Sequence, residues 1–138
     1  MYLIDTSVWI DLFRQRDTGP AKMLRALLDR RLPYGITSVI YQEVLQGASS
    51  EHDFRRLRDY LGTQRFYHPT DLVRSYVEAA HLYVRCRQQG ITIRSTIDCL
   101  IARIAIEHKL LLLHNDNDYL QLAKIEPQLQ LATTGLAP

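Results

Sequence analysis

The chain has 138 residues, of which 46% are hydrophobic and 23% charged, a balance that is typical of one globular domain with a sizeable core. A formal net charge of +2 excludes a long acidic or basic tail, and no apolar run reaches the ~18 residues that a membrane span requires. The two cysteines lack the spacing of metal ligands and the N-terminus lacks a signal-peptide pattern, so we expect a reduced, cytoplasmic protein without a membrane partner.

The chain opens with a short apolar segment that ends in polar residues. The run 2–4 has the pattern of a buried strand of a parallel sheet, and an acid and two hydroxyl residues follow it, Asp5, Thr6 and Ser7. Residues 8–13 have helical spacing, with Asp11 as the odd polar position. Asp5 therefore lies where α/β sheets bind ligands, or this turn merely caps the helix; the segment alone leaves both open.

Strands and helices alternate along the rest of the chain. Further strands are expected at residues 34–37, 65–68, 110–113 and 129–132. Helices are expected at residues 21–28, 39–46, 51–61, 71–89, 96–108 and 119–124. This alternation predicts an α/β fold, a three-layer α/β/α sandwich around a parallel sheet of four or five strands. Right-handed crossovers place the carboxyl ends of all strands at one edge, so the acids that follow different strands should meet there.

The longest expected helix, residues 71–89, is rich in aromatic residues. Thr70 is its expected N-cap, and Gly90 ends it. Its expected inward face consists of Leu72, Val73, Tyr76, Ala79, Ala80, Tyr83 and Val84. The segment 72–84 is also one candidate surface for a two-fold dimer.

Two further acids stand among apolar residues. Glu43 lies in the helix after the second strand, and Asp98 lies in the apolar segment 97–102. Each has a structural explanation, because Glu43 can lie on a solvated flank and Ser95 with Asp98 resembles a capping box. Together with Asp5 and Asp116, however, they would place four carboxylates at one sheet edge. The like charges of four such carboxylates repel one another. We therefore expect a protein to keep this cluster mainly where it binds a hard divalent cation such as Mg²⁺ or Mn²⁺.

Four segments carry a specific family resemblance. They are Leu3-Ile4-Asp5-Thr6-Ser7-Val8-Trp9-Ile10, Glu43-Val44-Leu45-Gln46-Gly47, Ile97-Asp98-Cys99-Leu100-Ile101-Ala102 and Leu113-His114-Asn115-Asp116-Asn117-Asp118-Tyr119. In order and spacing they resemble the four signatures of the PIN domain, and more narrowly those of the VapC toxins of toxin–antitoxin pairs. The resemblance covers nearly the whole chain, so we treat residues 1–138 as a single PIN-like nuclease domain.

The resemblance implies a function and partners. It implies an endoribonuclease that depends on Mg²⁺ or Mn²⁺ and hydrolyses phosphodiester bonds of tRNA or other structured RNA with a metal-activated water. It also implies a homodimer that a small cognate antitoxin neutralises. A catalytically inactive PIN-like scaffold that binds RNA or protein is the alternative.

The resemblance also assigns residues. The positions that match the family's acidic quartet are Asp5, Glu43, Asp98 and Asp116. Asp5, Asp98 and Asp116 are the implied metal ligands, with Glu43 and Asp118 as accessory acids.

Other residues near these motifs have lesser expected roles. Thr6 and Ser7 match positions where the family has a hydroxyl or amide that supports the site. Arg94 is the candidate for RNA phosphate, because it shortly precedes the helix of Asp98. His114 departs from the family's common threonine or serine; it either packs at the strand end or contacts phosphate or a carboxylate.

Two other kinds of protein, a family of phosphatases and a receiver domain, also place an acid after the first strand. Haloacid dehalogenase-type phosphatases need a second acid two residues later, where this chain has Ser7. Response-regulator receivers need an acidic pair near the end of the first strand, which here ends in a single acid. Both patterns disfavour an aspartyl-phosphate mechanism.

Overall fold

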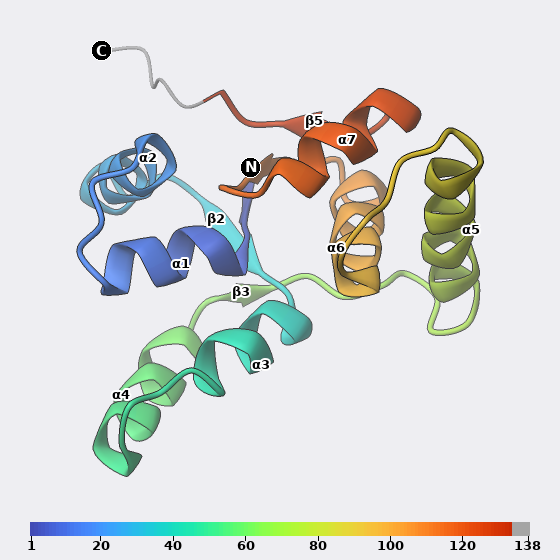
Figure 1. Cartoon of the computed structure of the whole chain (residues 1–138). Helices are drawn as coiled ribbons and strands as arrows, with labels where there is room; N and C mark the ends of the chain where they lie inside the picture. The colour runs from blue at the N-terminus through green and yellow to red at the C-terminus, as the bar shows by residue number, and fades with distance from the viewer. Residues whose placement is uncertain (134–138) are drawn as a thin grey trace.

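The structure is a computed structural model that describes residues 1–133, and these residues form a parallel five-stranded sheet between two groups of helices (Figure 1). The strands are β1 (Tyr2–Ile4), β2 (Tyr34–Ile36), β3 (Arg65–Phe66), β4 (Leu111–Leu113) and β5 (Gln130–Leu131). They lie in the order β3-β2-β1-β4-β5, and every neighbouring pair is parallel. The predicted three-layer fold is confirmed. The last five residues of the expected single domain, 134–138, lie outside the described part.

The helices form two groups on opposite sides of the sheet (Figure 1). One group comprises α1 (Thr6–Phe13), α2 (Gly19–Asp29), α3 (Ser38–Leu45) and α4 (Glu51–Leu61). The other comprises α5 (Arg74–Gln88), α6 (Thr96–Glu107) and α7 (Asn117–Ile125). The chain runs outward from β1 to β3 and then returns to place β4 beside β1, so the strand order reverses between β1 and β4. Crevices at such reversals are where open α/β sheets bind ligands.

The two central strands are apolar throughout because both faces of the sheet are covered. Leu3, Ile4, Leu112 and Leu113 are completely buried, and Leu3 pairs with Leu112. The backbone N–H of Asp5 donates to the carbonyl of Leu113 at 2.9 Å, which continues the ladder beyond the strand ends. The first acid of the chain is thereby fixed beside the loop that follows β4.

Three helices begin at residues that differ slightly from the expected ones. Helix α1 starts at Thr6 because the carboxylate of Asp5 accepts the backbone N–H of Ser7 and acts as N-cap. Helix α3 starts at Ser38 with Thr37 as its cap, and α7 starts at Asn117 with Asp116 as its cap. In each case the N-cap is a polar residue shortly after a strand end, so two of the site acids, Asp5 and Asp116, are also capping residues.

The expected start of the long helix is wrong. Helix α5 begins at Arg74, because the Asp71 carboxylate accepts the backbone N–H groups of Val73 and Arg74 and forms a separate turn. Thr70 does not cap the helix; its backbone N–H donates to Glu107 instead.

The expected inward face of this helix is also largely wrong. The residues that α5 buries are Ser75, Ala79, Leu82 and Cys86. Leu72 and Val73 are 77% and 74% exposed, and Tyr76 is 49% exposed. The apolar stripe read from the sequence is therefore mostly a surface. Among residues 1–133, no helix combines the length and apolar character needed to cross a membrane.

Candidate metal centre

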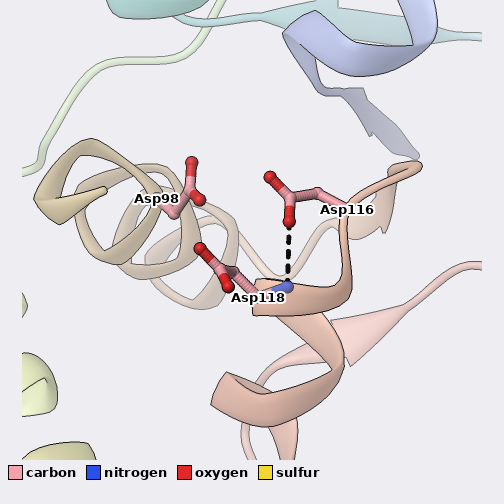
Figure 2. Close-up of side chains that lie close together, drawn as sticks. All are labelled: Asp98, Asp116 and Asp118. Carbon is pink, nitrogen blue, oxygen red and sulfur yellow. Dashed lines mark hydrogen bonds between the residues drawn. The ribbon is translucent and has the colours of Figure 1, made fainter. Parts of the chain in front are cut away.

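Three carboxylates from two segments gather at the carboxyl edge of the sheet (Figure 2). Asp98 lies in the first turn of α6, Asp116 is the N-cap of α7, and Asp118 lies in the first turn of α7. One oxygen of each carboxylate lies within 4.8 Å of the others. Asp98 and Asp118 are buried, with 9% and 5% exposure, so their charges are poorly solvated. We call these three residues the aspartate cluster.

Arg94 lies directly against the aspartate cluster. Its guanidinium Nη2 donates to Asp116 at 3.1 Å, and its Nε lies 3.6 Å from Asp118. Its backbone N–H also donates to Asp118 at 3.0 Å. The side chain is 74% exposed, so it covers the cluster from the solvent side. The residue expected to contact RNA phosphate is therefore at the site and offsets part of its negative charge.

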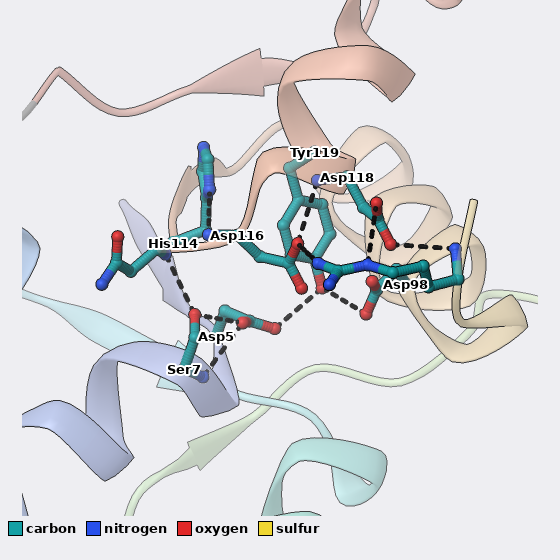
Figure 3. Close-up of polar contacts among 9 residues, drawn as sticks. Asp5, Ser7, Asp98, His114, Asp116, Asp118 and Tyr119 are labelled. Carbon is teal, nitrogen blue, oxygen red and sulfur yellow. Dashed lines mark hydrogen bonds and ion pairs between the residues drawn. The ribbon is translucent and has the colours of Figure 1, made fainter. Parts of the chain in front are cut away.

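Asp5 lies beside the aspartate cluster and is held at both of its oxygens (Figure 3). Its Oδ2 accepts the hydroxyl and the backbone N–H of Ser7 at 2.6 and 3.0 Å. Its Oδ1 accepts the hydroxyl of Tyr119 at 2.8 Å. The same hydroxyl oxygen lies 3.3 Å from Oδ1 of Asp98. Asp5 is 5% exposed, so these donors stabilise a carboxylate that water hardly reaches.

Glu43 approaches the site from α3. The Thr6 hydroxyl donates to its Oε1 at 2.7 Å, so both hydroxyl residues after β1 hold an acid. Burial raises the pKa of Glu43, the Thr6 hydrogen bond lowers it, and the charge of Asp5 raises it further; the net shift is upward. A carboxylate with a raised pKa is a better proton acceptor than an ordinary glutamate.

Asp98 has the most strongly raised pKa among these acids. Burial, and after it the charges of Asp5, Asp116 and Asp118, raise the pKa of its carboxyl from 3.8 to about 7. The repulsion expected among the clustered acids therefore contributes to this shift, after burial. Without a cation, the folded protein therefore favours a protonated Asp98 up to near-neutral pH.

His114 contacts the site through its ring nitrogen. Its Nδ1 accepts the backbone N–H of Asp116 at 3.1 Å, and its ring packs on Tyr119 with 5.2 Å between ring centroids. Burial lowers its pKa, although the charges of Asp5 and Asp116 oppose this shift. A neutral imidazole that accepts this N–H orients the loop between β4 and α7. His114 thus combines packing at the strand end with orientation of an acid.

The side chains present fit a hard divalent cation. The cluster offers carboxylate oxygens only, which are the ligands that Mg²⁺ and Mn²⁺ prefer. Within residues 1–133, one basic side chain, the exposed guanidinium of Arg94, forms ion pairs with this cluster of three acids, through Asp116 and Asp118. An uncompensated negative charge in a buried setting favours a bound cation, because the cation relieves the repulsion.

The structure brings most of the predicted site residues together. Asp98, Asp116 and Arg94 adjoin one another, whereas Asp5 and Glu43 lie at the margin, each held by its own hydroxyl donor. The third member of the aspartate cluster is Asp118, whereas the sequence-based assignment had Asp5 as the third metal ligand. Sequence reasoning missed Tyr119, because its link to Asp5 spans 114 positions. No pattern in the sequence predicts that contact.

The sequence matches a known family along most of its length. The family model described as the PIN domain matches residues 2–125. The chain is 32% identical over 126 residues to "VapC ribonuclease Mb1587" of Mycobacterium bovis and, at the same identity, to "Ribonuclease VapC11" of Mycobacterium tuberculosis. Each match covers 91% of this chain and 93% of the relative.

Solved structures with the same fold have lower sequence identity. A VapBC-1 structure from nontypeable Haemophilus influenzae superposes with a TM-score of 0.70 at 21% identity, over 96% of this chain and 97% of that one. VapBC2 from Rickettsia felis, bound to a DNA fragment from its promoter, gives 0.69 at 19% identity, over 95% and 96%. At these identities the likeness establishes the fold.

Proposed function

The chain belongs to the PIN domain family, and from this premise we propose that it is an endoribonuclease, the toxin of a toxin–antitoxin pair, which hydrolyses RNA phosphodiester bonds. Relatives named as ribonucleases at 32% identity support the reaction. The single observation that carries the proposal is the aspartate cluster, three carboxylates within 4.8 Å at the switch point of the sheet.

The aspartate cluster is the proposed metal site. Asp98, Asp116 and Asp118 would hold Mg²⁺ or Mn²⁺, with Asp5 at its margin. When bound, such an ion activates water and stabilises the charge that develops on the phosphate in phosphodiester hydrolysis. These four acids, together with Glu43, are the residues to which we assign the chemistry.

The remaining side chains have roles of their own. Glu43 has a raised pKa and one oxygen held by Thr6, which leaves Oε2 to accept a proton from the attacking water. Arg94 is exposed and planar, and can exchange its contact with Asp116 for an RNA phosphate. Ser7 keeps Asp5 oriented throughout.

The proposal extends to partners and location. The substrate class is tRNA or another structured RNA, and the protein partner is a small cognate antitoxin, as the VapBC names of the structural neighbours suggest. The functional unit is a homodimer. A cytoplasmic location accords with the two buried free thiols, Cys86 and Cys99, because reducing compartments keep cysteines unpaired.

RNA cleavage tests this function. The purified protein is incubated with total tRNA and Mg²⁺ or Mn²⁺, with and without EDTA. We expect endonucleolytic fragments whose formation EDTA abolishes. Asp98→Asn should lower the cleavage rate at least about 100-fold, because mutating even a residue that only orients a metal ligand can lower activity by up to that factor. Asp59→Asn is the matched control, because Asp59 is 71% exposed, lies on α4 in the other group of helices and, within the described residues, forms its ion pair with the neighbouring Arg58.

The alternative function gives a different result in the same assay. An inactive scaffold would bind RNA without cutting it, whichever metal ion is added, and Asp98→Asn and Asp59→Asn would behave alike. Cleavage that survives both EDTA and Asp98→Asn would instead indicate a metal-independent nuclease and would contradict the assignment of the cluster.

A further inference from the structure

Tyr119 is a completely buried polar residue within the site that the proposed chemistry leaves without a role. Its side chain has 0% exposure, and it lies in α7 one residue after Asp118. Its ring packs on His114, and its hydroxyl points at the two acids that come from β1 and α6 (Figure 3). A buried tyrosine normally finds one partner for its hydroxyl; this hydroxyl lies between two carboxylates.

The geometry of this hydroxyl constrains both acids. It lies 2.8 Å from Oδ1 of Asp5 and 3.3 Å from Oδ1 of Asp98. A phenol carries one proton and can donate to one carboxylate at a time. Both oxygens are nevertheless held within hydrogen-bond reach of one atom, whose position is fixed by a packed ring. Tyr119 therefore sets the distance between the end of β1 and the start of α6 at the site.

Asp5 depends on Tyr119 for its link to Asp98, the member of the aspartate cluster that lies on α6. The other oxygen of Asp5 accepts from Ser7, whose hydroxyl in turn accepts the backbone N–H of Asn115, so this second link leads to the loop between β4 and α7 and not to Asp98. Among residues 1–133, the Tyr119 hydroxyl is the side-chain group that lies within hydrogen-bond distance of both Asp5 and Asp98. Without this hydroxyl, two buried acids would lie near each other with no hydrogen-bond donor between them.

We propose that Tyr119 is a positioning residue that holds Asp5 and Asp98 in the arrangement that binds the divalent cation. The inference rests on the proposed function, since it concerns the metal site of that same reaction. Partners that orient metal ligands commonly contribute ~10–100-fold to metal affinity. Removing the hydroxyl alone should therefore weaken metal binding while the fold is kept.

Tyr119→Phe tests this role with Mn²⁺ as the probe. Binding of Mn²⁺ to the metal-free, full-length protein is measured by calorimetry, without RNA. We expect the dissociation constant to rise about 10-fold or more in Tyr119→Phe. Tyr41→Phe is the matched control, because the Tyr41 hydroxyl also donates at 2.8 Å, to the carbonyl of Arg58, away from the site. Its Mn²⁺ affinity should equal that of the wild type.

A second variant keeps the test decisive if Tyr119→Phe folds poorly. Ser7→Ala removes the other side-chain donor to Asp5 but leaves the link to Asp98, so we expect a smaller loss of affinity than in Tyr119→Phe and a larger combined loss in the double variant. Urea unfolding of each metal-free variant is measured in parallel. A merely structural role would lower stability and leave the dissociation constant of the folded protein unchanged.

The outcomes separate this inference from the proposed function. If the wild type binds Mn²⁺ and Tyr119→Phe binds it equally well, the positioning role is overturned and the nuclease proposal stands. An equal loss of affinity in Tyr41→Phe would also overturn it, because the effect would then be global. If the wild type binds no Mn²⁺, both the inference and the metal site beneath it are overturned.

Discussion

Asp98 is the residue at which the charge of the site opposes folding. Burial and three neighbouring acids raise its pKa from 3.8 to about 7. An acid with a raised pKa in the folded state holds its proton more tightly there than in the unfolded chain, so stability falls as pH rises from the unfolded to the folded pKa. The cost is absent near pH 3 and complete above about pH 8.

Asp98→Asn should remove this cost in the metal-free protein. At pH 8 in EDTA we expect the variant to be more stable than the wild type by up to about 4 kcal/mol, since one pKa unit corresponds to about 1.4 kcal/mol. Toward pH 4 the difference should shrink to near zero, because Asp98 is then protonated. Urea unfolding at a series of pH values measures this. A difference that does not change with pH would contradict the electrostatic explanation.

At the residue scale, the sequence predicted which acids gather but not how they are held. Asp98 and Glu43 stood out because acids are rare among apolar residues, and the expected strand order directed the acids to one edge. The family resemblance pointed to Ser7 as a supporting hydroxyl, but the Tyr119 donor was not predicted, because hydrogen bonds depend on side-chain directions that no periodicity encodes. For the same reason, the sequence could not reveal that Asp118 lies in the aspartate cluster.

At the element scale, a buried charge joins α1 to the loop that carries Asp116. The Asp11 carboxylate is 5% exposed and accepts from Asn115 Nδ2 at 2.7 Å, from Thr18 at 3.1 Å and from Arg16 at 3.2 Å. The backbone N–H of Asn115 in turn donates to the Ser7 hydroxyl. The odd polar position of the first helix is thus the anchor of the loop between β4 and α7.

Asp11→Ala should loosen this anchor. We expect a loss of about 1–3 kcal/mol in unfolding free energy, because several donors lose a buried charged acceptor. Chemical denaturation measures the loss. Asp17→Ala is the control, since Asp17 is 75% exposed and pairs with exposed side chains of Lys22 and Arg25; its effect should stay within about 0.5 kcal/mol. Equal effects in the two variants would show that the Asp11 network contributes nothing specific.

The errors at the element scale have a common physical cause. Strand and helix positions followed from periodicity and from polar caps, and six of the seven helices within residues 1–133 begin within two residues of the expected start. The exception is α5, where Asp71 captures two backbone N–H groups and closes a separate turn. Its buried face was wrong because an apolar stripe is equally consistent with a core face and with an interface.

At the scale of the whole molecule, the apolar surface of α5 needs an explanation. Within residues 1–133, five of the eight exposed large hydrophobic side chains lie on α5, on the turn before it or at the adjoining start of α6, namely Leu72, Val73, Tyr76, Val77 and Ile97. A mainly apolar hollow of about 390 Å³ lies between α5 and α6 beside them. Contiguous exposed apolar surface is typical of a protein interface. This is the surface that we propose for the expected homodimer.

Val77→Glu should dissociate that dimer. Val77 is 60% exposed in α5, so a charge there costs little in the monomer but would be desolvated between two copies. We expect a dimer for the wild type and a monomer for the variant by sedimentation at micromolar concentration. Tyr60→Glu, at a 44% exposed position on α4, should remain dimeric. A monomeric wild type, or an unaffected Val77→Glu, would exclude this surface as the dimer interface.

The central claim is that the aspartate cluster is a metal site, and thermal unfolding with Mn²⁺ tests it most directly. An ion that binds only the folded state stabilises the wild type by about 2.7 kcal/mol at 100 times its dissociation constant. At pH 8 we expect Mn²⁺ to raise the melting temperature of the wild type and of Asp59→Asn alike. Asp98→Asn should melt higher than the wild type in EDTA and gain little from Mn²⁺. A wild-type melting temperature that Mn²⁺ leaves unchanged, or an equal gain in Asp98→Asn, would contradict the claim.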